Sequence, residues 1–125
     1  PSSQDILELT RLLASVGTVQ VETSGTYEIN VYHKTWVTVS PKVNMLGGLE
    51  VLNTALSRAD ELKMPINGLK DVKNLLKLVK EQNYGRLIWL QPVSQELKNT
   101  ELCVNEAKNN NWRVSIQTHK YMGVR

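Results

Sequence analysis

At 125 residues, the chain has the length of one compact domain with a buried core. Its 41% hydrophobic and 22% charged residues exclude a disordered protein, and no apolar run is long enough to span a membrane. A formal net charge of +3 is too small to indicate nucleic acid binding. We therefore expect a single domain over residues 1–125, in the cytoplasm, with no membrane partner and no direct nucleic acid partner.

The first half of the chain predicts two helices and three strands. Apolar residues at helical spacing predict a helix over residues 6–16, and alternation predicts a strand over 18–22. Alternation is weak over 27–32 and stronger over 36–40, where β-branched and aromatic residues favour a strand. The paired glycines before residue 49 precede a second expected helix, at residues 49–57.

The next segment is ambiguous. Residues 60–66 carry apolar side chains, but Pro65 argues against a central strand because proline has no N–H to donate. Residues 70–81 have apolar side chains on one helical face and four lysines on the other, which predicts a helix with one solvated face, ended by Gly85.

The last part alternates strand and helix. Residues 86–90 form a continuous apolar run, typical of a strand that is covered on both faces. A helix over 95–109 and a strand over 112–116 follow. Strands separated by helices indicate βα crossovers, and therefore an α/β fold with mostly parallel strands and crossover helices.

Polar clusters follow four of the expected strands. The carboxyl ends of parallel strands share one edge of the sheet, so these side chains should surround one ligand site. Hydroxyls, an amide, a carboxylate and cations suit a ligand with a carboxylate and several hydroxyl or amine groups. Each cluster alone is also typical of a turn. The clusters are Glu22-Thr23-Ser24, Ser40-Pro41-Lys42, Gln91-Pro92-Val93-Ser94 and Gln117-Thr118-His119-Lys120.

Four motifs together resemble the C-terminal half of 7-carboxy-7-deazaguanine synthase, a radical S-adenosylmethionine enzyme family of queuosine (7-deazapurine) biosynthesis. They are VETSGT (21–26), TWVTVSPKVNMLGG (35–48), WLQPVS (89–94) and NWRVSIQTHKYM (111–122). The resemblance implies a partial (β/α) barrel of the radical S-adenosylmethionine type. It also implies a lyase that uses S-adenosylmethionine, a [4Fe-4S] cluster and Mg²⁺ to convert 6-carboxy-5,6,7,8-tetrahydropterin to 7-carboxy-7-deazaguanine.

The chain departs from this family at the cluster. Intact members hold the cluster through three closely spaced cysteines, whereas this chain has one cysteine, Cys103, placed between apolar residues in an expected helix. We expect the chain to be a C-terminal piece of the enzyme that is inactive alone. Accordingly, we assign no catalytic residue and no metal ligand to it.

The resemblance implies two sets of binding residues. Ser94 is also a typical helix N-cap, a role that is compatible with binding, and a structural reading in which His119 is simply hydrogen-bonded stays open. For S-adenosylmethionine the set is Glu22, Thr23, Ser24, Ser40, Pro41, Lys42, Gln91, Pro92, Val93 and Ser94. For the pterin substrate it is Gln117, His119, Lys120 and Arg125, the last through its terminal carboxylate.

Two other functions remain open from the sequence: a fragment of another radical S-adenosylmethionine activating enzyme, or a non-enzymatic α/β binding or interaction module. We also expect a homodimer, because a barrel without its early strands has an unpaired edge and bares apolar residues. The residues expected to be bared are Val19, Val21, Val37 and Val39.

Overall fold

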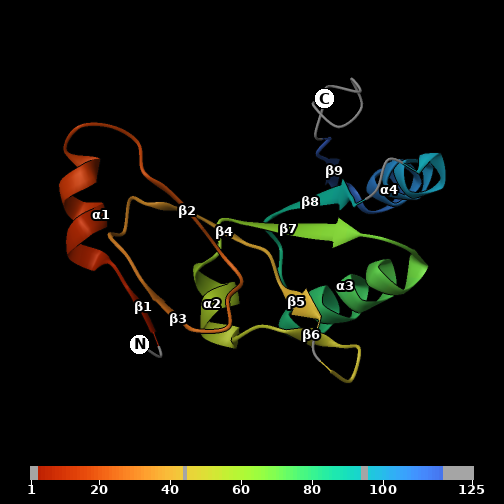
Figure 1. Cartoon of the computed structure of the whole chain (residues 1–125), viewed down its shortest axis with the longest axis horizontal. Coiled ribbons are helices and arrows are strands. Elements are labelled where there is room, and N and C mark those ends of the chain that lie inside the picture. Colours follow the sequence, from red (N-terminus) through yellow and green to blue (C-terminus); the bar gives the residue numbers. More distant parts are fainter. Residues whose placement is uncertain (1–2, 44, 94–95, 117–125) are drawn as a thin grey trace.

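The central feature of the chain is a parallel five-stranded sheet, seen in a computed structural model that describes residues 3–43, 45–93 and 96–116 (Figure 1). The elements in chain order are β1 (Ser3–Asp5), α1 (Leu7–Ala14), β2 (Gln20–Thr23), β3 (Glu28–Asn30), β4 (Trp36–Val39), β5 (Lys42–Val43), β6 (Leu49–Glu50), α2 (Asn53–Arg58), β7 (Glu61–Ile66), α3 (Leu69–Gln82), β8 (Leu87–Pro92), α4 (Leu97–Asn110) and β9 (Arg113–Val114).

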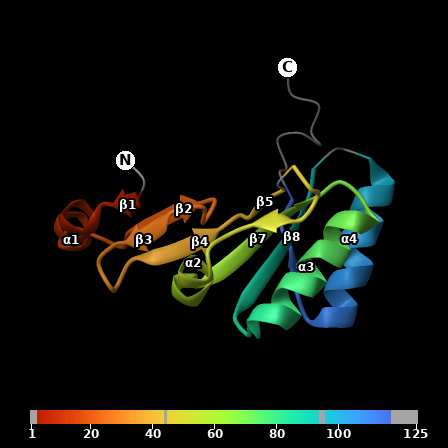
Figure 2. The same ribbon diagram turned by 90° about the horizontal axis from the view of Figure 1, so that it is seen from below.

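The strand order of the sheet is β2-β4-β7-β8-β9, and every neighbouring pair is parallel. Strands therefore follow one another in space as they do in the chain, as consecutive strands of a (β/α) barrel do. Helices α2, α3 and α4 make the last three crossovers and lie on the same face of the sheet (Figures 1 and 2). The predicted α/β fold with parallel strands and crossover helices is confirmed.

The helix-covered face of the sheet carries the core. Burial alternates along β7 and β8, where every second residue is buried. Side chains of α2, α3 and α4 pack on this face. The core residues of these elements are Val37, Val39, Leu62, Met64, Ile66, Ile88 and Leu90 from the strands, and Ala55, Leu56, Val72, Leu75, Cys103 and Ala107 from the helices.

Two expectations about exposure are wrong for this reason. Val37 and Val39, expected to be bared, have no exposed surface because they belong to this core. The run 86–90 is covered on one face only: Ile88 and Leu90 are buried, whereas Leu87 and Trp89 are half-buried on the opposite face of the sheet. We call that opposite face, which no helix of the described chain covers, the open face.

The ambiguous segment 60–66 is the central strand, so the argument from Pro65 is wrong. Strand β7 pairs with β4 only at Glu61 and Leu62, but with β8 along its whole length. Pro65 therefore lies where β7 has one neighbour, and proline is tolerated at such an edge position.

Helix boundaries also differ from expectation, and the structure explains the differences at α2 and α3. Residues 49–50 form β6, which pairs antiparallel with β5, so α2 begins only at Asn53. Helix α3 ends at Gln82 and is closed by Asn83, which adopts the left-handed conformation (φ 51°) that closes many helices, and not by Gly85.

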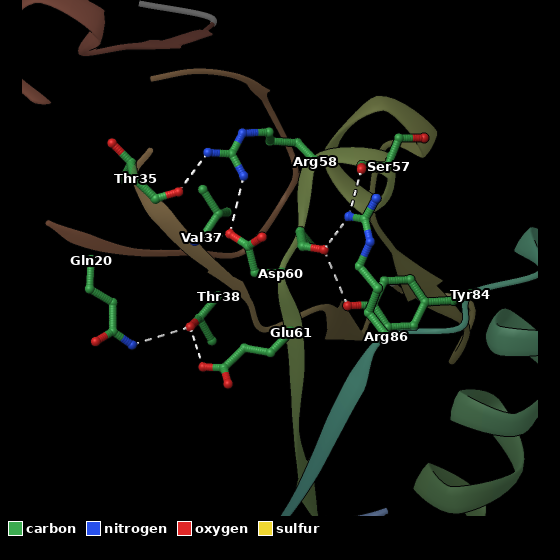
Figure 3. Close-up of polar contacts among 11 residues, drawn as sticks. Gln20, Thr35, Val37, Thr38, Ser57, Arg58, Asp60, Glu61, Tyr84 and Arg86 are labelled. Atoms are coloured by element: carbon green, nitrogen blue, oxygen red, sulfur yellow. Dashed lines mark hydrogen bonds and ion pairs between the residues drawn. The ribbon is translucent and has the colours of Figure 1, made fainter. Parts of the chain in front are cut away.

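The amino-terminal ends of three strands are tied together by side chains (Figure 3). The Asp60 carboxylate accepts the Val37 N–H at 2.8 Å and is paired with Arg58 at 3.2 Å. Arg86 donates to the Ala59 carbonyl at 2.6 Å, and the Tyr84 hydroxyl donates to the same carbonyl at 3.3 Å. These contacts hold the starts of β4, β7 and β8 next to one another.

A smaller unit stands beyond β2, at the left of Figure 1. Strands β1 and β3 pair in parallel, and the Ile6 N–H donates to the Asn30 carbonyl at 3.0 Å as α1 begins. Helix α1 and the residues that follow it present much of the predicted apolar stripe to solvent, since Leu9, Leu12 and Val16 are 54%, 59% and 83% exposed. None of the helices described here is long and apolar enough to cross a membrane.

Candidate ligand site at the strand ends

A pocket of about 650 Å³ lies at the carboxyl ends of β2, β4 and β7. It brings together six of the predicted site residues, from two segments that are far apart in sequence. Three further residues, Val43, Met64 and Pro65, were not predicted. The full lining is Glu22, Thr23, Ser24, Ser40, Pro41, Lys42, Val43, Met64 and Pro65.

The register of β2 and β4 places the predicted clusters 22–24 and 40–42 next to each other at the same edge of the sheet. Thr23 pairs with Val39, and the Ser40 N–H donates to the Thr23 carbonyl at 2.8 Å. Both strands end there, so the residues that follow them meet at the sheet edge. Lys42 then enters β5, whose pairing with Glu50 of β6 fixes the backbone beside the pocket.

A tight turn shapes the β2 side of the pocket. The buried Thr23 hydroxyl accepts the Gly25 N–H at 3.2 Å, and the hydroxyls of Ser24 and Thr26 lie 3.0 Å apart. Gly25 has φ +75°, and a Cβ built on it would lie 2.8 Å from Val51 Cγ2 and 2.9 Å from Val39 Cγ1. Only glycine fits both the backbone conformation and the space.

The pocket combines one charge of each sign with an apolar wall. Glu22 and Lys42 are exposed at the rim, and neither side chain makes a hydrogen bond or ion pair to the described residues. Pro41 and Met64 are buried in the wall. A free carboxylate, a free ammonium and the Ser40 hydroxyl suit a ligand that carries hydroxyl, amine and carboxylate groups beside an apolar part.

A hydrogen-bonded cluster on the open face was missed from the sequence. The Glu61 carboxylate accepts the Thr38 hydroxyl at one oxygen and the Trp89 indole N–H at 2.9 Å at the other. Gln20 donates to Thr38 at 3.5 Å, and the Arg113 guanidinium lies 5.6 Å from the centre of the Trp89 ring. Figure 3 shows Gln20, Thr38 and Glu61 in this arrangement. The alternation of Glu61 and Lys63 with the apolar Leu62 and Met64 was the signal for it.

The third predicted cluster lies one strand further along the same edge. Gln91 and Pro92 end β8, in register with Pro65 and Ile66, and the Val93 N–H donates to the Ile66 carbonyl at 3.0 Å. These residues do not line the pocket, although Gln91 is the register partner of Pro65, which does.

Comparison with known proteins identifies relatives along nearly the whole chain. The chain is 46% identical over 127 residues to a protein of Escherichia coli strain K12, covering 99% of the chain, and 36% identical over 129 residues to a protein of Buchnera aphidicola. Its relatives are 7-carboxy-7-deazaguanine synthases. The chain spans 57% of the length of each of these two synthases, and no family model matches it.

A solved structure of such a synthase agrees with the fold. The crystal structure of QueE from Escherichia coli superposes with a TM-score of 0.82 at 46% identity, over 91% of this chain and 51% of that one. The resemblance to 7-carboxy-7-deazaguanine synthase predicted from the four sequence motifs is therefore confirmed, and so is the partial nature of the match.

Several site residues that the resemblance to the synthases implied lie outside the described residues. These are Ser94, at the end of the third cluster, and the whole substrate set, which consists of Gln117, His119, Lys120 and Arg125. Their roles stay predictions.

The one cysteine has none of the features of a ligand of the synthases' iron–sulfur cluster. Cys103 is fully buried on the core face of α4. Burial raises the pKa of its thiol to about 11, so the thiol stays protonated at neutral pH, whereas a cluster ligand is a thiolate. Among the described residues, no group of three or more His, Cys, Asp or Glu side chains could hold a metal ion.

Proposed function

We propose that this chain is the C-terminal part of a 7-carboxy-7-deazaguanine synthase, and that the strand-end pocket is its share of the S-adenosylmethionine site. The observation that carries the proposal is the convergence of Glu22–Ser24 and Ser40–Lys42 on one pocket in a chain that is 46% identical to such a synthase.

The chemistry of the pocket fits this cofactor. Glu22 and the hydroxyls of Ser24 and Ser40 can accept from or donate to ribose hydroxyls, and the Lys42 ammonium can bind a carboxylate. Pro41 and Met64 offer apolar surface to the adenosine. When bound, S-adenosylmethionine would supply the radical that starts the proposed reaction. The residues of the pocket bind and orient it.

The remaining components of the reaction are assigned by the resemblance. We propose that the [4Fe-4S] cluster is held by residues outside this chain, because its single cysteine is a buried thiol. We propose that the reaction also requires Mg²⁺, and we assign no residue of this chain as its ligand. The proposed substrate is 6-carboxy-5,6,7,8-tetrahydropterin, which loses ammonia as its ring contracts, at a cytoplasmic enzyme that binds neither nucleic acid nor a membrane.

A chimera tests the proposal. Residues 1–125 replace the matching part of the Escherichia coli synthase, and formation of 7-carboxy-7-deazaguanine is measured in the reconstituted protein. We expect the chimera to form product and the isolated chain to form none. A chimera that folds and binds its cluster but forms no product would overturn the proposal.

A further inference from the structure

Lys63 lies in the middle of the central strand, on the open face of the sheet. Side chains alternate along β7, so Lys63 shares this face with Glu61 on one side and Pro65 on the other, while Leu62 and Met64 are buried in the core. Lysine is unusual in the middle of a parallel sheet, where strands are commonly apolar on both faces. Its presence calls for a physical reason.

Lys63 is half-buried, and the described residues offer no counter-ion to its ammonium. In the part of the chain that the structure describes, it makes no hydrogen bond and no ion pair. The neighbouring carboxylate of Glu61 already has one oxygen occupied by the Thr38 hydroxyl and the other by the Trp89 indole N–H. Both oxygens of Glu61 are thus engaged by neutral donors, and Glu61 forms no ion pair with Lys63 in this structure.

Lys63 also lies next to the pocket. Its chain neighbours Met64 and Pro65 both line the pocket, as does Ser40 at the end of the adjacent strand β4. On the other side, Lys63 is the register partner of Trp89, whose ring is fixed by Glu61 and flanked by Arg113. Along the open face of β7, Lys63 is the residue that follows Pro65 away from the pocket, so a ligand that extended along this face would pass Pro65 and reach Lys63 next.

We propose that Lys63 binds a carboxylate of the ligand, so that the site continues from the strand ends onto the open face of the sheet. The inference rests on the proposed function, in which both the pterin and S-adenosylmethionine carry a carboxylate. An ammonium beside a partly desolvated carboxylate forms a charge-assisted hydrogen bond, which accounts for an unpaired lysine at this position.

The test measures binding to the 125-residue chain by ¹H–¹⁵N NMR titration, which detects weak complexes. Three ligands are compared: 6-carboxypterin, pterin without the carboxylate, and S-adenosylmethionine. The variants are Lys63→Met, which removes the charge but keeps the length, Lys63→Arg, which keeps the charge, and the control Lys73→Met on the exposed face of α3. Unchanged spectra away from residue 63 show that each variant is folded.

We expect Lys63→Met to weaken binding of one carboxylate ligand by about tenfold or more, since a hydrogen bond to a charged group contributes roughly 1.5–3 kcal/mol. Binding of the carboxylate-free pterin should not change, Lys63→Arg should retain most of the affinity, and Lys73→Met should bind like the wild type. The ligand whose affinity falls, 6-carboxypterin or S-adenosylmethionine, identifies the source of the carboxylate.

Two results would overturn the inference. If Lys63→Met binds all three ligands as the wild type does, Lys63 does not bind a carboxylate, whereas the proposed function is untouched. If the wild-type chain binds none of the three ligands, the inference and the proposed pocket fall together.

Discussion

Tyr84 and Cys103 show how burial sets the titration of single residues in this chain. Desolvation disfavours the charged form of each group, and it raises the pKa of Tyr84 to about 12 and that of Cys103 to about 11. A tyrosine in the unfolded chain loses its proton near pH 10. The unfolded state therefore binds fewer protons than the folded state between pH 10 and 12, and the free energy of unfolding falls as pH rises through this window.

Tyr84→Phe tests whether the titration of Tyr84 lowers the free energy of unfolding between pH 10 and 12. At pH 8 the variant should lose about 1 kcal/mol of unfolding free energy with the hydrogen bond to the Ala59 carbonyl. From about pH 10 to 12 it should lose less further stability than the wild type, because the titrating group is gone. Urea unfolding followed by tryptophan fluorescence measures both effects.

The control is Tyr27→Phe, at a tyrosine that is 45% exposed and makes no side-chain hydrogen bond to the described residues. Parallel pH curves for Tyr84→Phe and the wild type would contradict the account.

At the scale of elements, the spacing of apolar residues predicted those helices and strands whose pattern lies within one continuous segment. The helix over 70–81 and the strand over 86–90 were found because their patterns are long and regular, and they match α3 and β8. Strand β7 was missed because the argument from Pro65 assumed two neighbouring strands, and how far β4 extends beside β7 cannot be read from residues 60–66. Two-residue strands such as β5 and β6 carry too little pattern to recognise.

The residues of the candidate site, likewise, could be predicted only where the pattern lies within one segment. The ends of β2 and β4 were located because strong alternation stops there, and Glu22 and Lys42 indeed line one pocket. Met64 and Pro65 were missed together with β7, to which they belong. The Thr38–Glu61–Trp89 cluster joins three strands, and such a contact follows from the register of the sheet and not from any one segment.

Gly25 tests how the β2 turn supports the pocket. Gly25→Ala should lower the free energy of unfolding by roughly 1–3 kcal/mol, because the new Cβ would be strained at φ +75° and would overlap Val51 and Val39. Gly17→Ala is the matched control, since nothing lies within 4 Å of its Cβ position. It should change stability by about 0.5 kcal/mol at most. Equal losses in the two variants, measured by urea unfolding, would show that the turn is not constrained as described.

At the scale of the whole molecule, the α1 segment exposes several apolar side chains, and other exposed ones, such as Met45, Leu46 and Leu97, lie elsewhere along the chain. Val37 and Val39 are buried under helices, whereas Leu9, Leu12 and Val16 of the α1 segment are exposed. Strand β2 also has a single partner in the five-stranded sheet, so its other edge is open within the described residues. An exposed apolar helix beside an open strand edge favours association with another copy of the chain.

We therefore expect the isolated chain to form a homodimer, measured by sedimentation velocity over a range of concentrations. The double variant Leu9→Glu, Leu12→Glu should shift the chain toward monomer. The control Leu97→Glu changes a leucine that is 70% exposed on α4, far from α1, and should leave the dimer intact. A wild-type chain that stays monomeric at high concentration would refute the expectation.

The central claim is that the strand-end pocket binds S-adenosylmethionine, and the most direct measurement is the KM for S-adenosylmethionine of the chimera described above. Lys42→Met removes the ammonium at the pocket rim, so we predict an increase in this KM of about tenfold or more. Lys73→Met, on the exposed face of α3, should leave the KM unchanged. An active chimera whose KM for S-adenosylmethionine is the same with and without Lys42→Met would contradict the assignment of this pocket.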